Sequence, residues 1–364
     1  MDISVRIVRS TACIARTDGT MPALFDNESQ TDLFIGPPAN DLETVLQEKF
    51  TLLCMLDHYE RCRNLQPHAS YHTKYLDWMG RQLDAAREGR YEVVPADEVA
   101  HLLALSPAER NKESMRLRGL LVKLPKGAMA TGSARIRENC EAITRGEIDP
   151  LTLLLRGNTL MRIYDIGSFD HSGFMQSFSQ ANPHASILEV GAGTGGTTAK
   201  FIGNLSSYER YTFSDISAGF FPRAKQRFAA AERMDFLVFD VSKLPTDQEG
   251  LEEASYDLII APQVLHATPS LHETLRNVRC LLKPGGYLVL TETIDAKCRT
   301  AHYFFGVFEG WWLGDADGRS DGPCVSPDRW DRELRASGFS GLDHCVLDAE
   351  APYGFCALMV ARAM

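Results

Sequence analysis

Apolar residues recur every three to four positions between residues 41 and 145, the spacing of helices with one buried face. Ser106 followed by Pro107 marks one helix start, because serine caps helices and proline suits their first position. The pattern predicts helices over 42–56, 71–88, 96–105, 108–122, 135–144 and 150–155. Residues 1–40 instead show a brief alternation at Ile3, Val5 and Ile7 and then turn-forming residues. We therefore expect an irregular segment there, with a single edge strand at its start.

Short apolar runs replace this spacing from residue 187 onward. Five of them predict buried strands that alternate with helices: 187–190, 211–215, 236–240, 256–261 and 286–292. Such alternation is typical of an α/β fold with a doubly wound parallel sheet. Because the pattern changes near Asn182-Pro183, we expect a helical subdomain over 41–170 and a sheet domain over 171–364.

A glycine-rich loop follows the first predicted strand. Glycine allows sharp turns and close approach to a ligand, because it has no Cβ atom. An acid in such a loop would repel a diphosphate but suits a cationic or hydroxyl-bearing ligand, and S-adenosylmethionine fits this description. We expect cofactor contacts from Glu189, Gly191, Ala192, Gly193, Thr194 and Gly195.

The ends of the later strands continue this predicted cofactor site. Asp215 lies about 20 residues beyond the glycines, the usual distance for a carboxylate that binds ribose hydroxyls. Ile216 follows it, and Asp240 with Val241 stands where the adenine would lie. Gln263, after the fourth strand, is a further predicted cofactor contact. The alternative is a nucleotide-type α/β domain with unrelated chemistry, because glycine loops also mark dinucleotide sites.

Composition narrows the class of protein. The chain has 364 residues and a net charge of −10, whereas a nucleic-acid partner calls for a basic surface. No signal peptide or membrane-length apolar run is visible, so we expect a soluble cytoplasmic protein without a membrane partner. The nine cysteines include no Cys-x-x-Cys pair, and Cys54 and Cys62 are too far apart for a zinc knuckle. We therefore expect reduced thiols and no metal.

His266 and Glu292 form a candidate catalytic pair. Transfer of a methyl group to carbon requires a base to remove a proton from that carbon. His266 follows the fourth strand and Glu292 ends the fifth, so both should lie at the carboxyl edge of the sheet, where ligands bind in such folds. A carboxylate beside imidazole orients the ring and stabilises its protonated form. The alternatives are a histidine that caps the next helix and a solvated glutamate.

Other features near this edge have plainer interpretations. The aromatic residues of 303–312 form either core or the wall of an acyl pocket. His272 and His302 are interpreted as solvated. The polar run 314–319 lacks the ligand pattern of a calcium loop and is interpreted as a loop.

Several of these segments together resemble the C-methyltransferase domain of fungal highly reducing polyketide synthases, over about residues 45–350. The segments are 71–79, 189–198, 211–217, 264–268, 281–287, 310–314, 325–330 and 336–341. The resemblance implies a Rossmann-like class I S-adenosylmethionine-dependent methyltransferase sheet with an N-terminal helical subdomain. Methyltransferase sheets end in an antiparallel hairpin, and the runs 342–347 and 355–360 fit it. One departure is Pro262-Gln263, where Ser-Asn is expected.

The resemblance also implies a reaction. The acceptor would be a β-ketoacyl thioester on the phosphopantetheine arm of an acyl carrier protein, methylated at the α-carbon beside other synthase domains. S-adenosyl-L-homocysteine would be the product. The family's His–Glu base maps onto His266 and Glu292, and Tyr164 is a candidate acceptor-side residue. Two alternatives stay open: an O-methyltransferase for a free small molecule, and a non-catalytic module.

Overall fold

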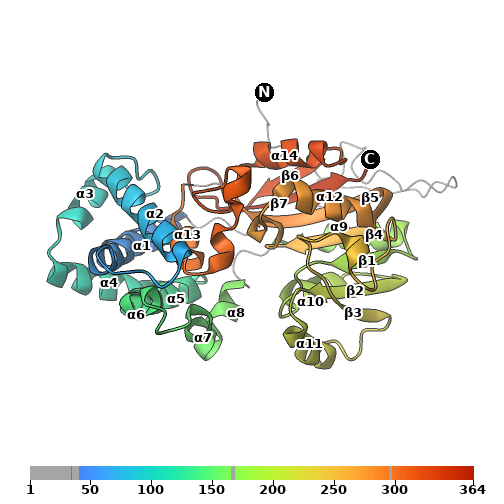
Figure 1. Ribbon diagram of the computed structural model, residues 1–364, viewed down its shortest axis with the longest axis horizontal. Helices are drawn as coiled ribbons and strands as arrows, with labels where there is room; N and C mark the ends of the chain where they lie inside the picture. The colour runs from blue at the N-terminus through green and yellow to red at the C-terminus, as the bar shows by residue number, and fades with distance from the viewer. Residues whose placement is uncertain (1–33, 35–40, 165–168, 295–296) are drawn as a thin grey trace.

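The computed structural model describes residues 34, 41–164, 169–294 and 297–364, and it places a group of helices beside a helix-covered sheet (Figure 1). Apart from Phe34, the predicted irregular segment, with its edge strand at 3–7, lies outside the described residues. None of the helices in the described ranges is long and apolar enough to cross a membrane.

The helical part surrounds α1, whose central residues are fully buried. Its helices are α1 (Asp41–Cys62), α2 (Ser70–Arg87), α3 (Ala96–Ala104), α4 (Pro107–Leu121), α5 (Gly127–Glu138), α6 (Cys140–Thr144), α7 (Pro150–Leu155) and α8 (Thr159–Tyr164). The start of α4 is confirmed: Ser106 Oγ accepts from Glu109 N, and Glu109 Oε2 accepts from Ser106 N at 2.9 Å.

The prediction of one helix over 135–144 is wrong, because the chain leaves helical geometry at Asn139. The Asn139 side chain donates to the Arg135 carbonyl at 2.8 Å, which competes with the helical ladder. Two helices result, α5 and α6, and α5 begins eight residues before the predicted start (135 − 127).

A seven-stranded sheet in the order β3-β2-β1-β4-β5-β7-β6 forms the second part. The strands are β1 (Ser186–Glu189), β2 (Arg210–Asp215), β3 (Met234–Val238), β4 (Tyr256–Pro262), β5 (Leu282–Thr293), β6 (His344–Leu347) and β7 (Cys356–Arg362). The first five pair in parallel, and β7 pairs antiparallel with both β5 and β6. The parallel sheet and the closing hairpin are therefore confirmed. The strand order reverses between β1 and β4, which is where ligands bind in open α/β sheets.

Helices cover both faces of this sheet. On one face α12 (Leu271–Leu281) and α14 (Pro327–Ala336) pack on Leu188 and Ile259. On the other face α9 (Ser172–Ala181) and α10 (Gly196–Ile202) pack on Ile187 and Leu258. Successive strand residues thus point to opposite faces, and both faces are covered, which explains the continuous apolar run 258–261 in β4. The short helix α11 (Phe221–Arg227) follows β2.

Residues that follow β5 return to the helical part. Helix α13 (Thr300–Phe305) and the turn η5 (Glu309–Trp312) share a core with α1 and α2. Glu48 Oε1 accepts from the Thr300 amide at 2.8 Å and from its hydroxyl at 2.6 Å. The helical part is therefore completed by residues from the second half of the chain, and the division at residue 170 stays a prediction.

Candidate active site

The structure brings the two predicted catalytic side chains into contact. His266 lies in the turn η4 (Leu265–Ala267) after β4, and its Nδ1 contacts Glu292 Oε2 on β5. Glu292 is fully buried, and its Oε1 accepts from the Leu265 amide at 2.9 Å. Neither plainer interpretation holds, because Ser270 caps α12 and Glu292 is not solvated.

This contact determines how the imidazole can act. An ionised carboxylate only accepts hydrogen bonds, so Nδ1 is assigned the proton and Nε2 keeps its lone pair. The Trp311 ring meets the His266 ring edge to face, with centroids 5.6 Å apart, which limits rotation of the imidazole. Such an arrangement would allow the imidazole to accept a proton at Nε2.

Arg319 holds the turn that carries His266, and the sequence analysis missed it. This buried guanidinium donates to the His266 carbonyl at 2.6 Å and to the Thr268 carbonyl at 2.5 Å. Its Nε donates to Asp317 at 2.7 Å, and Asp317 also accepts from the Leu271 amide at 2.9 Å. Part of the predicted loop 314–319 is thus a helical turn, η6 (Gly314–Asp317), that fixes the active-site turn.

A cavity of about 270 Å³ opens beside His266, between the helical part and the sheet edge. Met129 of α5 and Ile163 of α8 line it from the helical side. The aromatic run 303–312 divides in two. Tyr303, Phe304 and Trp312 belong only to the helical core, whereas Phe305, Phe308 and Trp311 pack on that core and also line the cavity.

Tyr164, at the end of α8, lines the same cavity. Its ring stacks on Phe305 with centroids 6.4 Å apart. Desolvation by the cavity walls, followed by the negative charge of Asp215, raises the pKa of its hydroxyl, although 55% of the residue surface remains exposed. The hydroxyl therefore stays protonated near neutral pH and can donate a hydrogen bond.

His302 is partly buried, in contrast to the prediction that it is solvated. It stacks on Trp78 with centroids 5.4 Å apart and meets the edge of Trp311 at 5.3 Å. Desolvation lowers its pKa to about 4, so the ring is a neutral part of the wall behind Trp311. His272, in contrast, is exposed.

At the predicted cofactor edge, Glu189 ends β1 with its side chain fully buried. Its Oε2 accepts from the hydroxyls of Thr198 and Tyr211, each at 2.6 Å. Its Oε1 has no hydrogen-bond partner among the described residues. Burial raises the pKa of Glu189 to about 7, so a nearby cation would favour its ionised form.

The loop after Glu189 curves around open space. Gly191 and Gly193 both have positive φ, and a Cβ atom on Gly191 would lie 2.7 Å from Val264. A Cβ atom on Gly193 would meet only the Gly191 carbonyl, at 3.9 Å, so a ligand can approach this residue. The Gly193 amide donates to Asp215 Oδ2 at 3.0 Å, which brings the predicted ribose ligand against the loop.

The other predicted cofactor residues lie around this loop. Ala192, Thr194 and Gly195 belong to it, and Ile216, beside Asp215, leaves 66% of its surface exposed. β3 ends before Asp240, whose carboxylate accepts from Ser242 and pairs with Lys243 at 3.1 Å. Burial opposes ionisation of Asp240, but these partners lower its pKa overall. Val241 is buried.

Gln263 has a φ of +55°, a strained conformation for a residue with a side chain. Its amide oxygen accepts from the Thr293 hydroxyl at 2.8 Å, and its Nε2 donates to Cys356 Sγ at 3.0 Å. Its side chain therefore joins β5 to β7 at the cavity that His266 lines. Its contact with a cofactor stays a prediction, as do the contacts of the loop residues.

The residues at this edge fit S-adenosylmethionine. The unpaired Glu189 oxygen suits a cationic group, Asp215 suits ribose hydroxyls, and the exposed Ile216 offers an apolar surface to a base. The glycine loop leaves room beside them.

Comparison with known proteins agrees with this site. Residues 188–288 match the family model described as a methyltransferase domain. The highly reducing polyketide synthase gloL of Glarea lozoyensis is 41% identical over 327 residues, which cover 86% of this chain and 13% of that synthase. This chain thus spans about an eighth of the synthases that it matches. The methyltransferase calH of Penicillium decumbens is 34% identical over 317 residues, with 85% and 82% covered.

Solved structures extend the match to the whole fold. The trans-methyltransferase CalH, crystallised with SAH, has a TM-score of 0.83 and covers 91% of this chain and 94% of its own. The carbon methyltransferase of CurJ has a TM-score of 0.64 at 26% identity, with 88% and 92% covered. The methyltransferase domain of the citrinin polyketide synthase, at 21% identity and a TM-score of 0.68, shares the fold. The chain therefore belongs to the S-adenosylmethionine-dependent carbon methyltransferases of the fungal highly reducing polyketide synthase family.

Proposed function

We propose that the chain methylates the α-carbon of a β-ketoacyl thioester carried on the phosphopantetheine arm of an acyl carrier protein. The observation that carries the proposal is the buried His266–Glu292 pair at the wall of a largely apolar cavity. Methylation of a carbon acceptor requires such a base, because the carbon must lose a proton to become nucleophilic. The relatives that are polyketide synthases support this substrate class.

The cofactor would be held at the glycine loop. S-adenosylmethionine supplies a methyl group that its sulfonium makes electrophilic. Glu189 would face its positive charge, Asp215 its ribose, and Ile216 its adenine. Tyr164 lines the cavity, and the nearby charge of Asp215 contributes to the raised pKa of its hydroxyl. The acceptor would therefore lie between His266 and the glycine loop.

His266 would act at its Nε2. The α-proton is acidic because the β-keto and thioester carbonyls both flank that carbon. When Nε2 takes this proton, the electron pair of the C–H bond passes into the enolate. Glu292 would stabilise the imidazolium that forms, and Arg319 would keep the turn in position.

The remaining cavity residues would bind and shelter the acceptor. Phe305, Phe308 and Trp311 offer apolar surface to an acyl chain. The Tyr164 hydroxyl would donate a hydrogen bond to a carbonyl oxygen as negative charge develops there. Since the relatives are multidomain synthases, the carrier protein and neighbouring synthase domains are the proposed partners.

A mass-shift assay tests this function. The chain is incubated with S-adenosylmethionine and β-ketoacyl pantetheine thioesters, and fragmentation locates the new methyl group. We expect a methyl group on the α-carbon. The matched β-hydroxyacyl thioesters should not react, because their α-proton is far less acidic. Methylation on oxygen, equal reaction of the β-hydroxy compounds, or binding of S-adenosylmethionine without turnover would contradict the proposal.

A further inference from the structure

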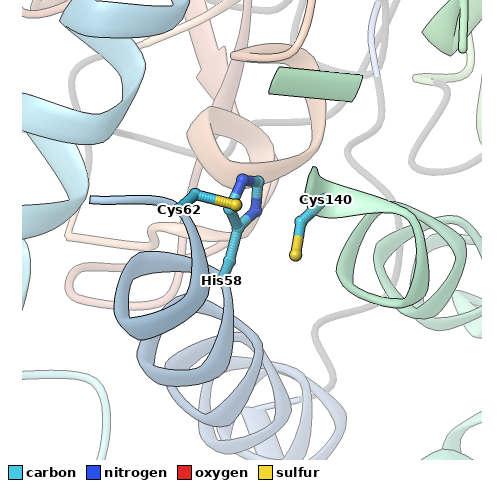
Figure 2. Close-up of side chains that lie close together, drawn as sticks. All are labelled: His58, Cys62 and Cys140. Carbon is cyan, nitrogen blue, oxygen red and sulfur yellow. The ribbon is translucent and has the colours of Figure 1, made fainter. Parts of the chain in front are cut away.

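Three metal-binding side chains meet inside the helical part, away from the cavity that His266 lines. Figure 2 shows Cys62 beside His58 on one helix, α1, and Cys140 facing them from α6. One ligand atom from each lies within 4.8 Å of the other two. All three residues are buried, and His58 exposes 1% of its surface.

The local fold explains how these residues meet. His58 and Cys62 are four positions apart on α1, which places them on the same face of the helix. Cys140 is the first residue of α6, directly after the break at Asn139 that ends α5. An unbroken helix would carry Cys140 onward along the axis of α5. The sequence gives little sign of this group, because the second thiol follows 78 residues after the first (140 − 62).

The three side chains are almost completely buried, at 1% exposure or less. His58 Nδ1 has no hydrogen-bond partner among the described residues. The His58 ring instead meets the rings of Tyr75 at 5.4 Å and Tyr303 at 5.9 Å, edge to face in both contacts. Burying two thiols and an imidazole costs free energy, and a shared ligand would offset that cost.

We propose that His58, Cys62 and Cys140 bind a zinc ion. Sulfur and imidazole ligands suit zinc, whereas calcium and magnesium prefer oxygen. Two thiolates and a neutral imidazole balance the charge of Zn²⁺, which lowers the cost of burial; Cu⁺ with the same ligands would leave a net negative charge. In a tetrahedral zinc site, such atoms lie about 3.6–3.8 Å apart, which small side-chain rotations can reach from the observed group.

Three protein ligands leave the fourth position of the tetrahedron for a water molecule. The site would join α1 to α6 beneath Tyr303 of α13. The same helix, α13, ends with Phe305 in the cavity wall. We therefore assign the zinc a structural purpose: it would stabilise the helical part and, through α13, the acceptor wall.

Metal content of the full chain tests this site. The protein, purified without a histidine tag, is reduced, saturated with zinc and dialysed, and bound metal is measured by mass spectrometry. We expect about one zinc per chain in the wild type and almost none in the double variant Cys62→Ser, Cys140→Ser. Cys54→Ser is the matched control, because Cys54 is a buried thiol on the same helix outside the group, and it should keep its zinc.

A second measurement needs no variant. Chelation of the wild-type protein should lower its thermal midpoint by several degrees, and zinc should restore it, since a ligand bound only to the folded state stabilises that state. Cobalt should give a thiolate-to-metal absorption band. No zinc uptake by the reduced wild type, or equal zinc in the double variant and Cys54→Ser, would overturn the assignment. An unchanged melting curve without a cobalt band would do the same.

Discussion

Three buried carboxylates at the sheet edge have different partners. Glu292 contacts His266 and accepts from the Leu265 amide, so its carboxylate is positioned to stabilise a positive charge on the imidazole. Asp215 accepts from two backbone amides, those of Gly193 and Ser217. Glu189 keeps one oxygen without a hydrogen-bond partner among the described residues. Of the three carboxylates, it is therefore the one that a bound ligand would stabilise most.

Glu189 should make cofactor affinity depend on pH. Burial raises its pKa to about 7, so below that pH the free protein must release a proton before the carboxylate can face a cation. The affinity for S-adenosylmethionine should therefore rise from pH 6 to pH 8 and then level off. Glu189→Gln should bind more weakly and lose this rise, as measured by calorimetry. The exposed Glu232→Gln is the control. An unchanged pH profile in Glu189→Gln would refute the assignment.

Tyr164→Phe removes one hydroxyl and keeps the ring on Phe305. A hydrogen bond to a charged acceptor is worth about 1.5–3 kcal/mol, so we expect kcat to fall about 10- to 100-fold. Affinity for the cofactor should change little. Steady-state kinetics with a β-ketoacyl thioester measures this, and an unaltered kcat would remove Tyr164 from the reaction.

At the scale of elements, the guanidinium of Arg319, just after η6, holds the turn η4 in place. Arg319 donates to the carbonyls of both His266 and Thr268, which the shorter lysine with its single ammonium group cannot do. Arg319→Lys should lower kcat about 10²-fold, the cost of a displaced catalytic group, with cofactor affinity unchanged. Arg332→Lys, at an exposed arginine of α14, should behave as wild type. Equal kinetics of the two variants would show that Arg319 does not position the base.

The elements differ in how far their sequence predicts them. β1, β4 and β5 were predicted because buried parallel strands carry nearly continuous apolar runs. Adjacent strand ends also predicted the meeting of His266 and Glu292. The Arg319 clamp could not be predicted, because it joins segments about 50 residues apart through backbone carbonyls that any sequence provides. The break at Asn139, where the side chain bonds the Arg135 carbonyl, leaves no trace in the apolar spacing on which the helix prediction was based.

At the scale of the whole molecule, the acceptor cavity belongs to neither part alone. Met129 and Ile163 come from the helical part, and His266 and Gln263 come from the sheet edge. Sequence spacing predicted both parts, but not that α13 would return to complete the helical core. That return depends on long-range packing and on buried bonds such as the one between Glu48 and Thr300.

The size of this cavity should determine which acyl chain lengths the protein methylates efficiently. Phe305 lines it and stacks on Trp311 with centroids 5.3 Å apart, so Phe305→Trp adds volume inside the wall. We expect kcat/KM to fall about tenfold for long β-ketoacyl thioesters and little for short ones, as excluded methylene groups lose their contacts. A chain-length series measures this. A uniform loss at every length would show that Phe305 acts on the fold and not on the acyl chain.

The methyl-transfer rate of His266→Ala, with cofactor affinity measured on the same protein, tests the central claim most directly. Removal of a general base costs about 10²–10⁴ in rate, and His266 does not belong to the glycine loop. We expect a loss of that size with nearly unchanged binding of S-adenosylmethionine, and a smaller loss in Glu292→Gln, whose amide still orients the ring. Turnover near the wild-type rate by His266→Ala at neutral pH would contradict the account.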